Sequence, residues 1–427
     1  MLTFRLLFVS ASLFLVDAIV PTARYNGGCV AIRNQMFCYG GTENRQTSTN
    51  HYTLDLSTDF TVADSIKAWN TVDPGNYQVE PNSLFSIVPL NDSYLIHGGL
   101  GYASSTKFIK NVTTLYNVTA KSWSTVQAAN QSLIMPSREG TSTLDSHNQL
   151  WVWGGLSDNV TNTNVTHTTY HEEFQTLDMN TLTWSLPTNI TKTSSLSPRI
   201  AHTATLSKSG DVIYFIGGLQ VSNGYQLSYA PMNDILQFNI TNQTWSLHHS
   251  PGNTTIPSPR RLHSATAIPD TDLIFIYGGS VTDGAGTVSD YMYTLNTTSY
   301  VYTPVHATNS NQAKAGPRFG HSAVLYDKRS LFIIFGADEL GSLRNDFAVL
   351  DIKNWNWVET FKADSNYPTP SSQNPPSTIS NKPANTATFA SSGSSSSLNN
   401  SDQVFIKFNY MKTLYFIIGI TLLFSFF

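Results

Sequence analysis

Charge is scarce in this sequence. Asp, Glu, Lys and Arg together make up 12% of the 427 residues, compared with about 25% in an average soluble domain, and the formal net charge is only -4. The chain also has no run of basic residues. Proteins that bind nucleic acid neutralise phosphates with clustered Lys and Arg, so this composition argues against a nucleic acid partner and is typical of an extracellular globular protein.

Cysteine is almost absent, since Cys29 and Cys38 are the only two in the chain. If Arg33-Asn34 forms a two-residue hairpin loop, residue 29 faces residue 38 as a non-hydrogen-bonded pair, where side chains across an antiparallel ladder approach most closely. We therefore expect a disulfide between the two, which would stiffen the first repeat. The alternative is a pair of free buried thiols.

The sequence also lacks the patterns of common catalytic sites. We find no Ser-His-Asp constellation, no phosphate-binding loop and no pair of carboxylates at catalytic spacing. Metal-ligand residue types gather locally at His167, His171, Glu172 and Glu173. A helix would place both histidines on one face, as a zinc site needs, but Thr168, Thr169 and Tyr170 favour extended structure. We therefore predict a solvated loop that leads into a strand, with no metal and no cofactor.

Glycine pairs at the ends of apolar runs reveal an internal repeat. They are Gly40-Gly41, Gly98-Gly99, Gly154-Gly155, Gly217-Gly218, Gly278-Gly279 and the degenerate Gly336-Ala337. Subtracting successive first positions gives steps of 58, 56, 63, 61 and 58 residues. Short segments rich in Val, Ile, Tyr, Phe, Thr and Trp, separated by turn residues, make each unit a set of strands, and this period is typical of propeller blades.

The segment from Ser197 to Trp245 is the clearest copy of the unit. We predict four antiparallel strands in it. The first, from Ala201 to Leu206, alternates in polarity, whereas the second, from Val212 to Ile216, is apolar at every position. Both faces of the second strand must be buried, as they are when it lies between two neighbouring blades. The third strand is more exposed, and the short fourth carries the Trp.

With these motifs the chain resembles the kelch-repeat superfamily, to which the propeller domain of galactose oxidase also belongs. The resemblance covers about Asn26 to Trp357 and rests on the glycine pair followed by a spaced aromatic residue. That position is held by Trp69, Trp123, Trp184, Trp245 and Trp357, and in the fifth unit by Tyr300 or Tyr302. Units one to three lack a full Arg-x-x-His opening, and Ala337 replaces a glycine. The resemblance implies an all-β, six-bladed kelch-type propeller with four antiparallel strands per blade.

The same resemblance raises an enzymatic alternative. Galactose oxidase-type catalysis uses copper held by Tyr and His, and a thioether between a tyrosine and an unpaired cysteine. A bridge between Cys29 and Cys38 would leave no such cysteine, and Tyr170-His171, the nearest adjacent Tyr-His pair, falls in a predicted loop. A copper-dependent oxidoreductase or another sugar-active enzyme therefore stays the alternative, and we lean towards a protein that is not an enzyme.

The two ends of the sequence differ from the repeats. Residues 1-18 combine Arg5, an apolar core and Val16-Asp17-Ala18, as a secretory signal peptide does, so we expect the mature chain to start at Ile19 and the propeller to occupy 19-363. Residues 364-401 are rich in Pro, Ser, Thr and Asn, which predicts a disordered stalk. Residues 402-427 end in an apolar tail that begins at Thr413, which favours a glycolipid-anchor signal over a short transmembrane helix.

Potential N-glycosylation sites are numerous. Asn-x-Ser/Thr occurs at Asn91, Asn111, Asn117, Asn130, Asn159, Asn164, Asn189, Asn239, Asn242, Asn253, Asn296 and Asn399. A chain this rich in Asn, Ser and Thr would contain roughly eight such triplets by chance, so we expect about half of them to carry glycans.

Recurrent polar residues mark the openings of the repeats. With four antiparallel strands, the long connections between second and third strands share one end with the starts of the first strands. Arg138, Arg199, Arg260 and Arg318 should therefore encircle the central opening there. They could bind carboxylates or sugar hydroxyls, or brace the neighbouring blade through backbone carbonyls. We interpret His202, His263 and His321 as structural, and Asp234, Asp290 and Asp346 as turn or strand-cap residues.

Taken together, the sequence predicts a secreted, membrane-tethered binding module at the cell surface. We expect it to be non-catalytic and to bind a protein or cell-surface carbohydrate on its loop-rich face.

Overall fold

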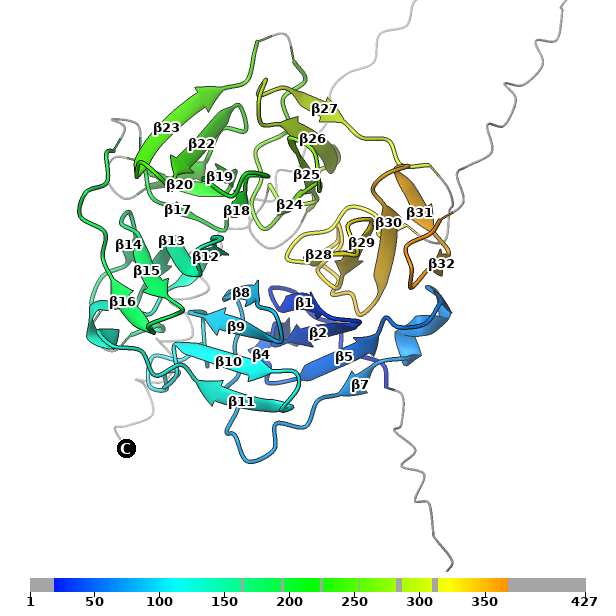
Figure 1. Ribbon diagram of the computed structural model, residues 1–427, viewed down its shortest axis with the longest axis horizontal. Helices are drawn as coiled ribbons and strands as arrows, with labels where there is room; N and C mark the ends of the chain where they lie inside the picture. The colour runs from blue at the N-terminus through cyan, green and yellow to red at the C-terminus, as the bar shows by residue number, and fades with distance from the viewer. Residues whose placement is uncertain are drawn as a thin grey trace, which may run out of the picture. The chain divides into compact units, whose positions relative to one another are not determined.

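The fold is built almost entirely from antiparallel β-strands. The computed structural model describes residues 19–162, 165–192, 196–222, 226–252, 254–281, 286–308 and 314–367 (Figure 1). Two single-turn 3-10 helices, η1 (Asp64–Lys67) and η2 (Gln131–Leu133), accompany the strands. No helix in these ranges is long and apolar enough to cross a membrane. The predicted signal peptide and the segments 368–427 lie outside the described residues.

Within those ranges, six sheets each follow a path of four hydrogen-bonded antiparallel strands, numbered here in chain order as sheets 1 to 6. Sheet 1 holds β1 (Gly28–Ile32), β2 (Gln35–Tyr39), β5 (His51–Asp55) and β7 (Asn70–Thr71). Sheet 2 holds β8 (Ser86–Pro89), β9 (Ser93–His97), β10 (Thr113–Asn117) and β11 (Ser122–Thr125). Sheet 3 holds β12 (Arg138–Leu144), β13 (Gln149–Ser157), β15 (Gln175–Asp178) and β16 (Thr183–Ser185).

The second half of the chain repeats the pattern. Sheet 4 holds β18 (Thr203–Leu206), β19 (Val212–Ile216), β22 (Asp234–Asn239) and β23 (Thr244–His249). Sheet 5 holds β24 (Ser264–Ala267), β25 (Leu273–Tyr277), β26 (Met292–Asn296) and β27 (Tyr302–Pro304). Sheet 6 holds β28 (Ser322–Tyr326), β29 (Ser330–Ile334), β30 (Phe347–Asp351) and β31 (Asn356–Val358).

The first strands of the sheets contact one another in a closed cycle, β1 to β8, β12, β18, β24, β28 and back to β1. The sheets therefore stand around a common centre, and the fourth strands lie at the periphery (Figure 1). Each second strand lies one place outward, between neighbouring sheets, and is buried over most of its length. This placement explains why these strands are apolar at nearly every position.

The spaced aromatic residue fills the same place in every sheet. Trp245 pairs with Phe238 across the third and fourth strands of sheet 4, and Tyr302 pairs with Leu295 in sheet 5. Both aromatic side chains are at least 94% buried (6% and 2% exposed). Tyr302, and not Tyr300, therefore replaces the Trp in the fifth unit.

The hairpin of β1 and β2 has the predicted register. Arg33-Asn34 forms the turn, and Cys29 lies opposite Cys38 with 4.1 Å between their Cα atoms. The two sulfurs form a disulfide, so the predicted pairing is confirmed.

The sixth glycine pair needs correction. Phe335 and Gly336 adopt positive φ of 59° and 92°, as the first and second glycines of the other pairs do. The Gly336 N–H donates to the Arg24 carbonyl, which is the bond that Gly41 and Gly218 make to the next sheet along. The pair is therefore Phe335-Gly336, and the prediction of Gly336-Ala337 was one residue late. A Phe in the left-handed region gave no sequence signal, since that conformation normally selects glycine.

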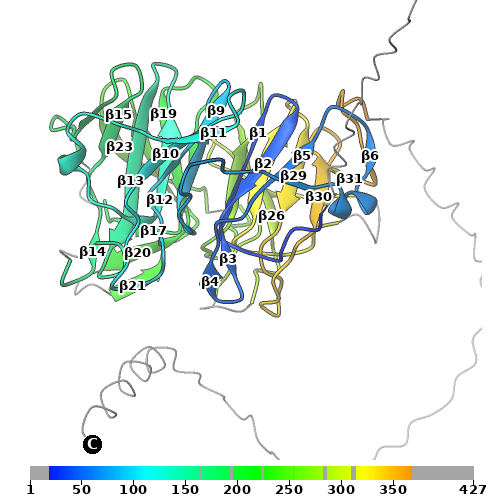
Figure 2. The same cartoon turned by 90° about the horizontal axis from the view of Figure 1, so that it is seen from below.

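Turns after the first and third strands lie together at one end of the sheets, here called the hairpin end. In each sheet the backbone N–H that follows the third strand donates to a carbonyl in the turn after the first strand, as Val118 does to Asp92 at 2.9 Å. The opposite end, here called the loop end, carries the connections between second and third strands. Extra strands extend several of these connections: β3 (Thr42–Glu43), β4 (Gln46–Thr47), β14 (Thr169–Tyr170), β20 (Leu219–Ser222) and β21 (Gln226–Tyr229) (Figure 2). The connection from Leu219 to Asn233 contains β20 and β21, which pair with each other, and β20 also pairs with β17 (Arg199–Ile200).

A clasp joins sheets 1 and 6. The segment between β5 and β7 contains β6 (Phe60–Thr61), which pairs with β32 (Thr360–Phe361). The chain stays packed beyond the predicted boundary at residue 363, because Ser365 and Tyr367 are buried against sheet 6. Packing therefore extends beyond the predicted end of the propeller, and residues 368–401 of the predicted stalk lie outside the described residues.

Candidate binding face and central opening

A closed ring of six backbone hydrogen bonds surrounds the central opening at the loop end. One residue from each sheet's leading segment donates its N–H to the carbonyl of its counterpart in the preceding sheet, over 2.7 to 3.1 Å. The members are Asn26, Leu84, Glu139, Ala201, Leu262 and Gly320. All six are in the left-handed region, with φ between 52° and 62°. That conformation costs a non-glycine residue about 1 kcal/mol, which the inter-sheet bonds offset.

Two cavities occupy the centre. One, of about 150 Å³, is lined by the ring residues and the residues that follow them, among them Gly140, His202 and His263. The other, of about 360 Å³, lies between the first strands of sheets 6, 1 and 2, and Gly27, Gly28 and Ile87 are among its lining residues. The lining of the second cavity is mainly small and apolar.

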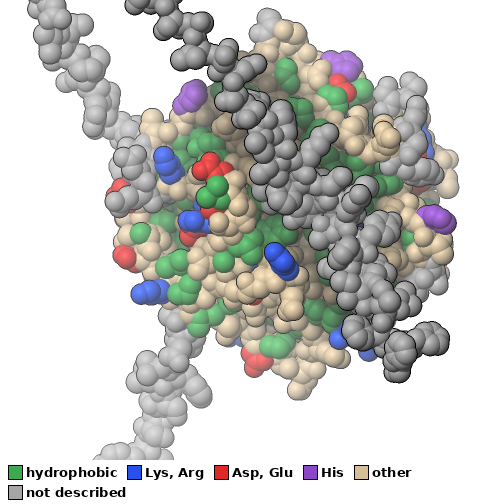
Figure 3. Space-filling view, turned by 180° about the vertical axis from the view of Figure 1, so that it is seen from behind, with side chains coloured by type: hydrophobic (Ala, Val, Ile, Leu, Met, Phe, Trp, Pro, Cys, Tyr) green, Lys and Arg blue, Asp and Glu red, His purple; other side chains and the backbone are tan. Residues whose placement is uncertain are grey.

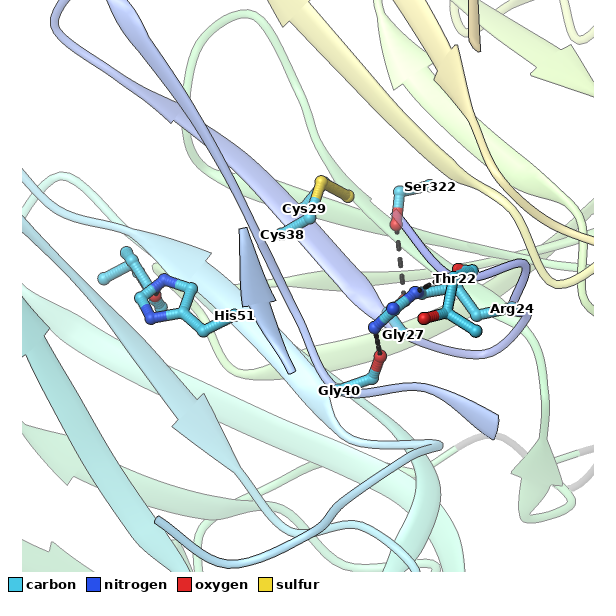
Figure 4. Close-up of a disulfide and its surroundings, with 9 residues drawn as sticks. Thr22, Arg24, Gly27, Cys29, Cys38, Gly40, His51 and Ser322 are labelled. Atoms are coloured by element: carbon cyan, nitrogen blue, oxygen red, sulfur yellow. Dashed lines mark hydrogen bonds between the residues drawn. A yellow bond between two sulfur atoms is a disulfide. The ribbon is translucent and has the colours of Figure 1, made fainter. Parts of the chain in front are cut away.

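Buried arginines stand two residues before the ring in four sheets. They are Arg24, Arg199, Arg260 and Arg318, with at most 4% of each residue exposed. Their guanidinium groups donate to backbone carbonyls at the end of the second strand in the same sheet, as Arg24 does to Gly40 at 2.8 Å (Figure 4) and Arg318 to Phe335 at 2.9 Å. Burial lowers the pKa of Arg199 to about 10, although Asp234 opposes the shift. These bonds support the bracing alternative, with the correction that each arginine braces its own sheet; ligand binding by these arginines stays a prediction.

Two of the three recurrent carboxylates pair with these arginines, whereas the third, Asp234, lies 2.9 Å from His249 Nδ1. Asp290 accepts from Arg260 at 2.9 Å and Asp346 from Arg318 at 3.1 Å. Burial alone would raise the pKa of Asp346, but Arg318 and Arg344 outweigh it and lower that pKa. The prediction that these aspartates are simple turn or strand-cap residues is therefore incomplete for Asp290 and Asp346, which neutralise buried arginines.

Arg138 does not belong to the same set. It stands one residue before Glu139, where the other arginines stand two residues before the ring, and its side chain is 20% exposed. Its guanidinium pairs with Glu139 and with Asp158 at 2.8 Å. Arg24 was not predicted from the sequence. The number of residues between Arg24 and Gly40-Gly41 is nevertheless similar to the number between the other arginines and their glycine pairs.

The three recurrent histidines join neighbouring sheets. The ring nitrogens Nε2 of His202 and His321 lie 3.0 Å and 2.8 Å from the hydroxyls of Thr141 and Ser264 in the preceding sheet. Burial lowers the pKa of both imidazoles to about 3, so they are neutral near pH 7. A Cβ atom at Gly154 would collide with Cε1 of His202, and one at Gly278 would collide with Cε1 of His321. Each of these glycines is the first of the pair in the preceding sheet. His263 makes the same type of contact, so the positions agree with the structural interpretation.

The side chains of His171, Glu172 and Glu173 do not converge on a common site. Thr169 and Tyr170 form strand β14, which agrees with the expected extended structure but makes the predicted loop wrong at these two residues. His171 Nε2 lies 2.7 Å from the Ser157 hydroxyl. Glu172 and Glu173 pair with Lys192 instead. Across the described ranges, no group of three or more His, Cys, Asp and Glu side chains is arranged to hold a metal ion. Both cysteines of the sequence are joined to each other, so neither can supply a thioether.

Three of the eight large apolar side chains that are exposed in the described residues lie in connections at the loop end. Leu227, Val281 and Leu340 lie in the connections between second and third strands of three consecutive sheets, and 41%, 39% and 80% of their surfaces are exposed. Figure 3 shows this end from behind the view of Figure 1, with apolar side chains among uncharged polar ones and only scattered charges on the part not covered in grey.

The described glycosylation candidates are all accessible. Asn91, Asn130, Asn159, Asn189 and Asn242 are exposed, whereas Asn111, Asn117, Asn239 and Asn296 are half-buried. Asn164, Asn253 and Asn399 lie outside the described residues.

Comparisons with known proteins agree with this architecture. The model of the KLHDC2/KLHL20/DRC7 Kelch-repeats domain matches residues 9–218, 84–311 and 206–383. Host cell factor 2 from Homo sapiens is 25% identical over 340 residues, which cover 73% of this chain and 39% of that protein. The Rho GTPase-activating protein gacHH from Dictyostelium discoideum is 28% identical over 161 residues, or 37% of this chain and 10% of that protein.

A solved structure shares the fold. The structure titled "Structure of YjhT" superposes with a TM-score of 0.55 at 13% identity, covering 80% of this chain and 99% of that one. The chain spans less than half the length of each of the two curated relatives.

Proposed function

Because the chain belongs to the kelch-repeat domain family, we propose that it is a six-bladed kelch propeller that binds a partner protein without catalysing a reaction. The cycle of six first strands and the ring of six hydrogen bonds support the blade number. Kelch domains generally bind proteins, and this chain adds varied loops on a rigid base.

The observation that carries the proposal is the row of Leu227, Val281 and Leu340 on adjacent loops. Exposed apolar side chains that gather at one end of a soluble domain mark a contact surface. The guanidinium groups beneath them are already hydrogen-bonded to the fold, so the protruding loops are the better candidate contact surface. A partner protein with an apolar patch fits this end better than a carbohydrate does.

A matched pair of double variants tests the surface. Leu227→Asp with Leu340→Asp changes two of these loops, and Leu133→Asp with Leu186→Asp changes exposed leucines outside the connections between second and third strands. Proteins captured from the surface of the producing cell by the wild type should be lost from the first variant and kept by the second. Loss from the second variant alone would reject the loop end as the docking surface, and capture of glycans on an array without any protein would favour a carbohydrate ligand.

We also propose that the protein is exported and tethered to the cell surface through its C-terminal tail. The support is the sequence of residues 1-18 and 402-427, together with a disulfide, which is typical of oxidising compartments. Treatment of intact cells with a phospholipase that cuts glycolipid anchors should release the protein. A mature peptide from 413-427 would instead show a retained transmembrane segment.

A further inference from the structure

The third strand of every sheet ends on an aspartate or asparagine. The six residues are Asp55, Asn117, Asp178, Asn239, Asn296 and Asp351. In each case the side-chain Oδ1 accepts a backbone N–H from the turn that follows, over 2.7 to 3.1 Å. The turn therefore requires the side-chain oxygen, which either residue type supplies.

An asparagine at this position also has an amide nitrogen, which the turn does not use. Within the described part of the chain, the Nδ2 groups of Asn117, Asn239 and Asn296 donate no hydrogen bond. By contrast, the Nδ2 of Asn130, which lies in another connection, donates to the Trp184 carbonyl. Each of the three asparagines is followed two residues later by an exposed threonine, namely Thr119, Thr241 and Thr298. Half of the repeats therefore combine a structural oxygen with a free nitrogen and a complete acceptor triplet.

We propose that Asn117, Asn239 and Asn296 carry N-linked glycans that cover the hairpin end. The proposal rests on the proposed export of the protein. The donor is a lipid-linked oligosaccharyl pyrophosphate: a C–N bond forms between the anomeric carbon and Nδ2, the bond from that carbon to the pyrophosphate oxygen breaks, and Nδ2 loses one proton. Oδ1 takes no part, so the glycosylated side chain still caps the turn.

The three positions are well placed to shield one surface. The turns after first and third strands are hydrogen-bonded to each other at the hairpin end, so a glycan there also covers the neighbouring turn. Two further triplets, at Asn91 and Asn242, lie in the same turns. Glycans on sheets 2, 4 and 5 would leave the loop end as the accessible surface for a partner.

Mass mapping of the secreted full-length protein tests the sites. Peptides that contain Asn117, Asn239 and Asn296 should be recovered as glycopeptides, and as Asp with heavy oxygen after enzymatic deglycosylation in H₂¹⁸O. Thr241→Ala separates Asn239 from Asn242, because the triplet of Asn242 uses Thr244 instead.

Matched variants test whether the Oδ1 atom of Asn296 stabilises the turn while its Nδ2 atom carries the glycan. Asn296→Asp and Thr298→Ala should each remove one glycan and have melting temperatures close to each other. Asn296→Ala also removes the turn oxygen and should melt below both. Equal melting of the Asp and Ala variants would overturn the structural part of the inference.

The outcome also separates this inference from the proposed function. A protein that is exported and glycosylated elsewhere, with the three asparagines unmodified, contradicts the inference alone. A protein that never enters the secretory pathway contradicts both.

Discussion

Histidine burial is the strongest effect at the scale of single residues. Burial lowers the pKa of His97 to about 4 and that of His51 to about 3, from the ordinary value of about 6.5. His97 keeps one hydrogen bond, to Thr113, and packs against Trp184. A protonated ring in this setting would carry an unsolvated charge, so the fold selects the neutral form.

This burial makes stability depend on pH. Between about pH 6.5 and pH 4 the unfolded chain binds more protons at His97 than the folded chain does, so the free energy of unfolding falls as the pH falls. At pH 5 the loss for one such histidine is about 2 kcal/mol relative to pH 7. Urea unfolding of the wild type and of His97→Gln at both pH values should show a smaller drop in the variant. Equal drops would mean that His97 does not titrate as its burial implies.

At the scale of elements, the clasp strengthens the junction between sheets 1 and 6. Each sheet is continuous in sequence, so no strand from one terminus completes a sheet built by the other. Closure uses the contact of β28 with β1 and the bond from the Asn26 N–H to the Gly320 carbonyl. The pairing of β6 with β32 adds to it, and there the rings of Phe60 and Phe361 stack with centroids 4.7 Å apart. Asp59 adds an ion pair with Lys362 at 2.7 Å.

Removal of the clasp contact should loosen the two sheets that it joins. Phe60 is half-buried, so we expect Phe60→Ala to lower the free energy of unfolding by about 2 kcal/mol. Amide hydrogen exchange should rise in sheets 1 and 6 more than in sheets 3 and 4. Leu186→Ala, on an exposed side chain away from the clasp, serves as the control. A uniform rise across all sheets would show that the clasp has no local role.

The sequence predicted what depends on local pattern. The apolar second strands, the Cys29–Cys38 register and the spaced aromatic residues follow from side-chain alternation and turn chemistry. It did not predict β6 and β32, which are two-residue strands far apart in the chain, or the hairpin of β20 and β21. Residue types alone do not reveal a non-local pairing of so few residues.

At the scale of the whole molecule, closure fixes the candidate binding face. Each repeat donates one ring hydrogen bond and accepts another, so the six leading segments cannot shift independently. The same closure explains why the burial of the arginines was not predicted. The sequence shows which arginines recur, but the residues that bury them are brought together only in the closed ring. Arg138 differs by one position and lies outside the buried set.

The compact unit should end near Tyr367. Arg329 donates to the carbonyls of Ser365 and Tyr367 at 3.1 Å and 3.3 Å, and the Tyr367 hydroxyl lies 2.7 Å from that of Ser330. These contacts bury Tyr367 to 6% exposure, so a protease should not reach the backbone there without unfolding sheet 6. Limited proteolysis of the full-length protein, followed by intact mass measurement, should yield a resistant core whose C-terminus lies at or beyond residue 367. Tyr367→Ala should move the boundary towards β31, because it removes both the ring contact with Arg329 and the hydroxyl pair. A wild-type core that ends before residue 360 would contradict this assignment, since β32 and the clasp would then be dispensable for the fold.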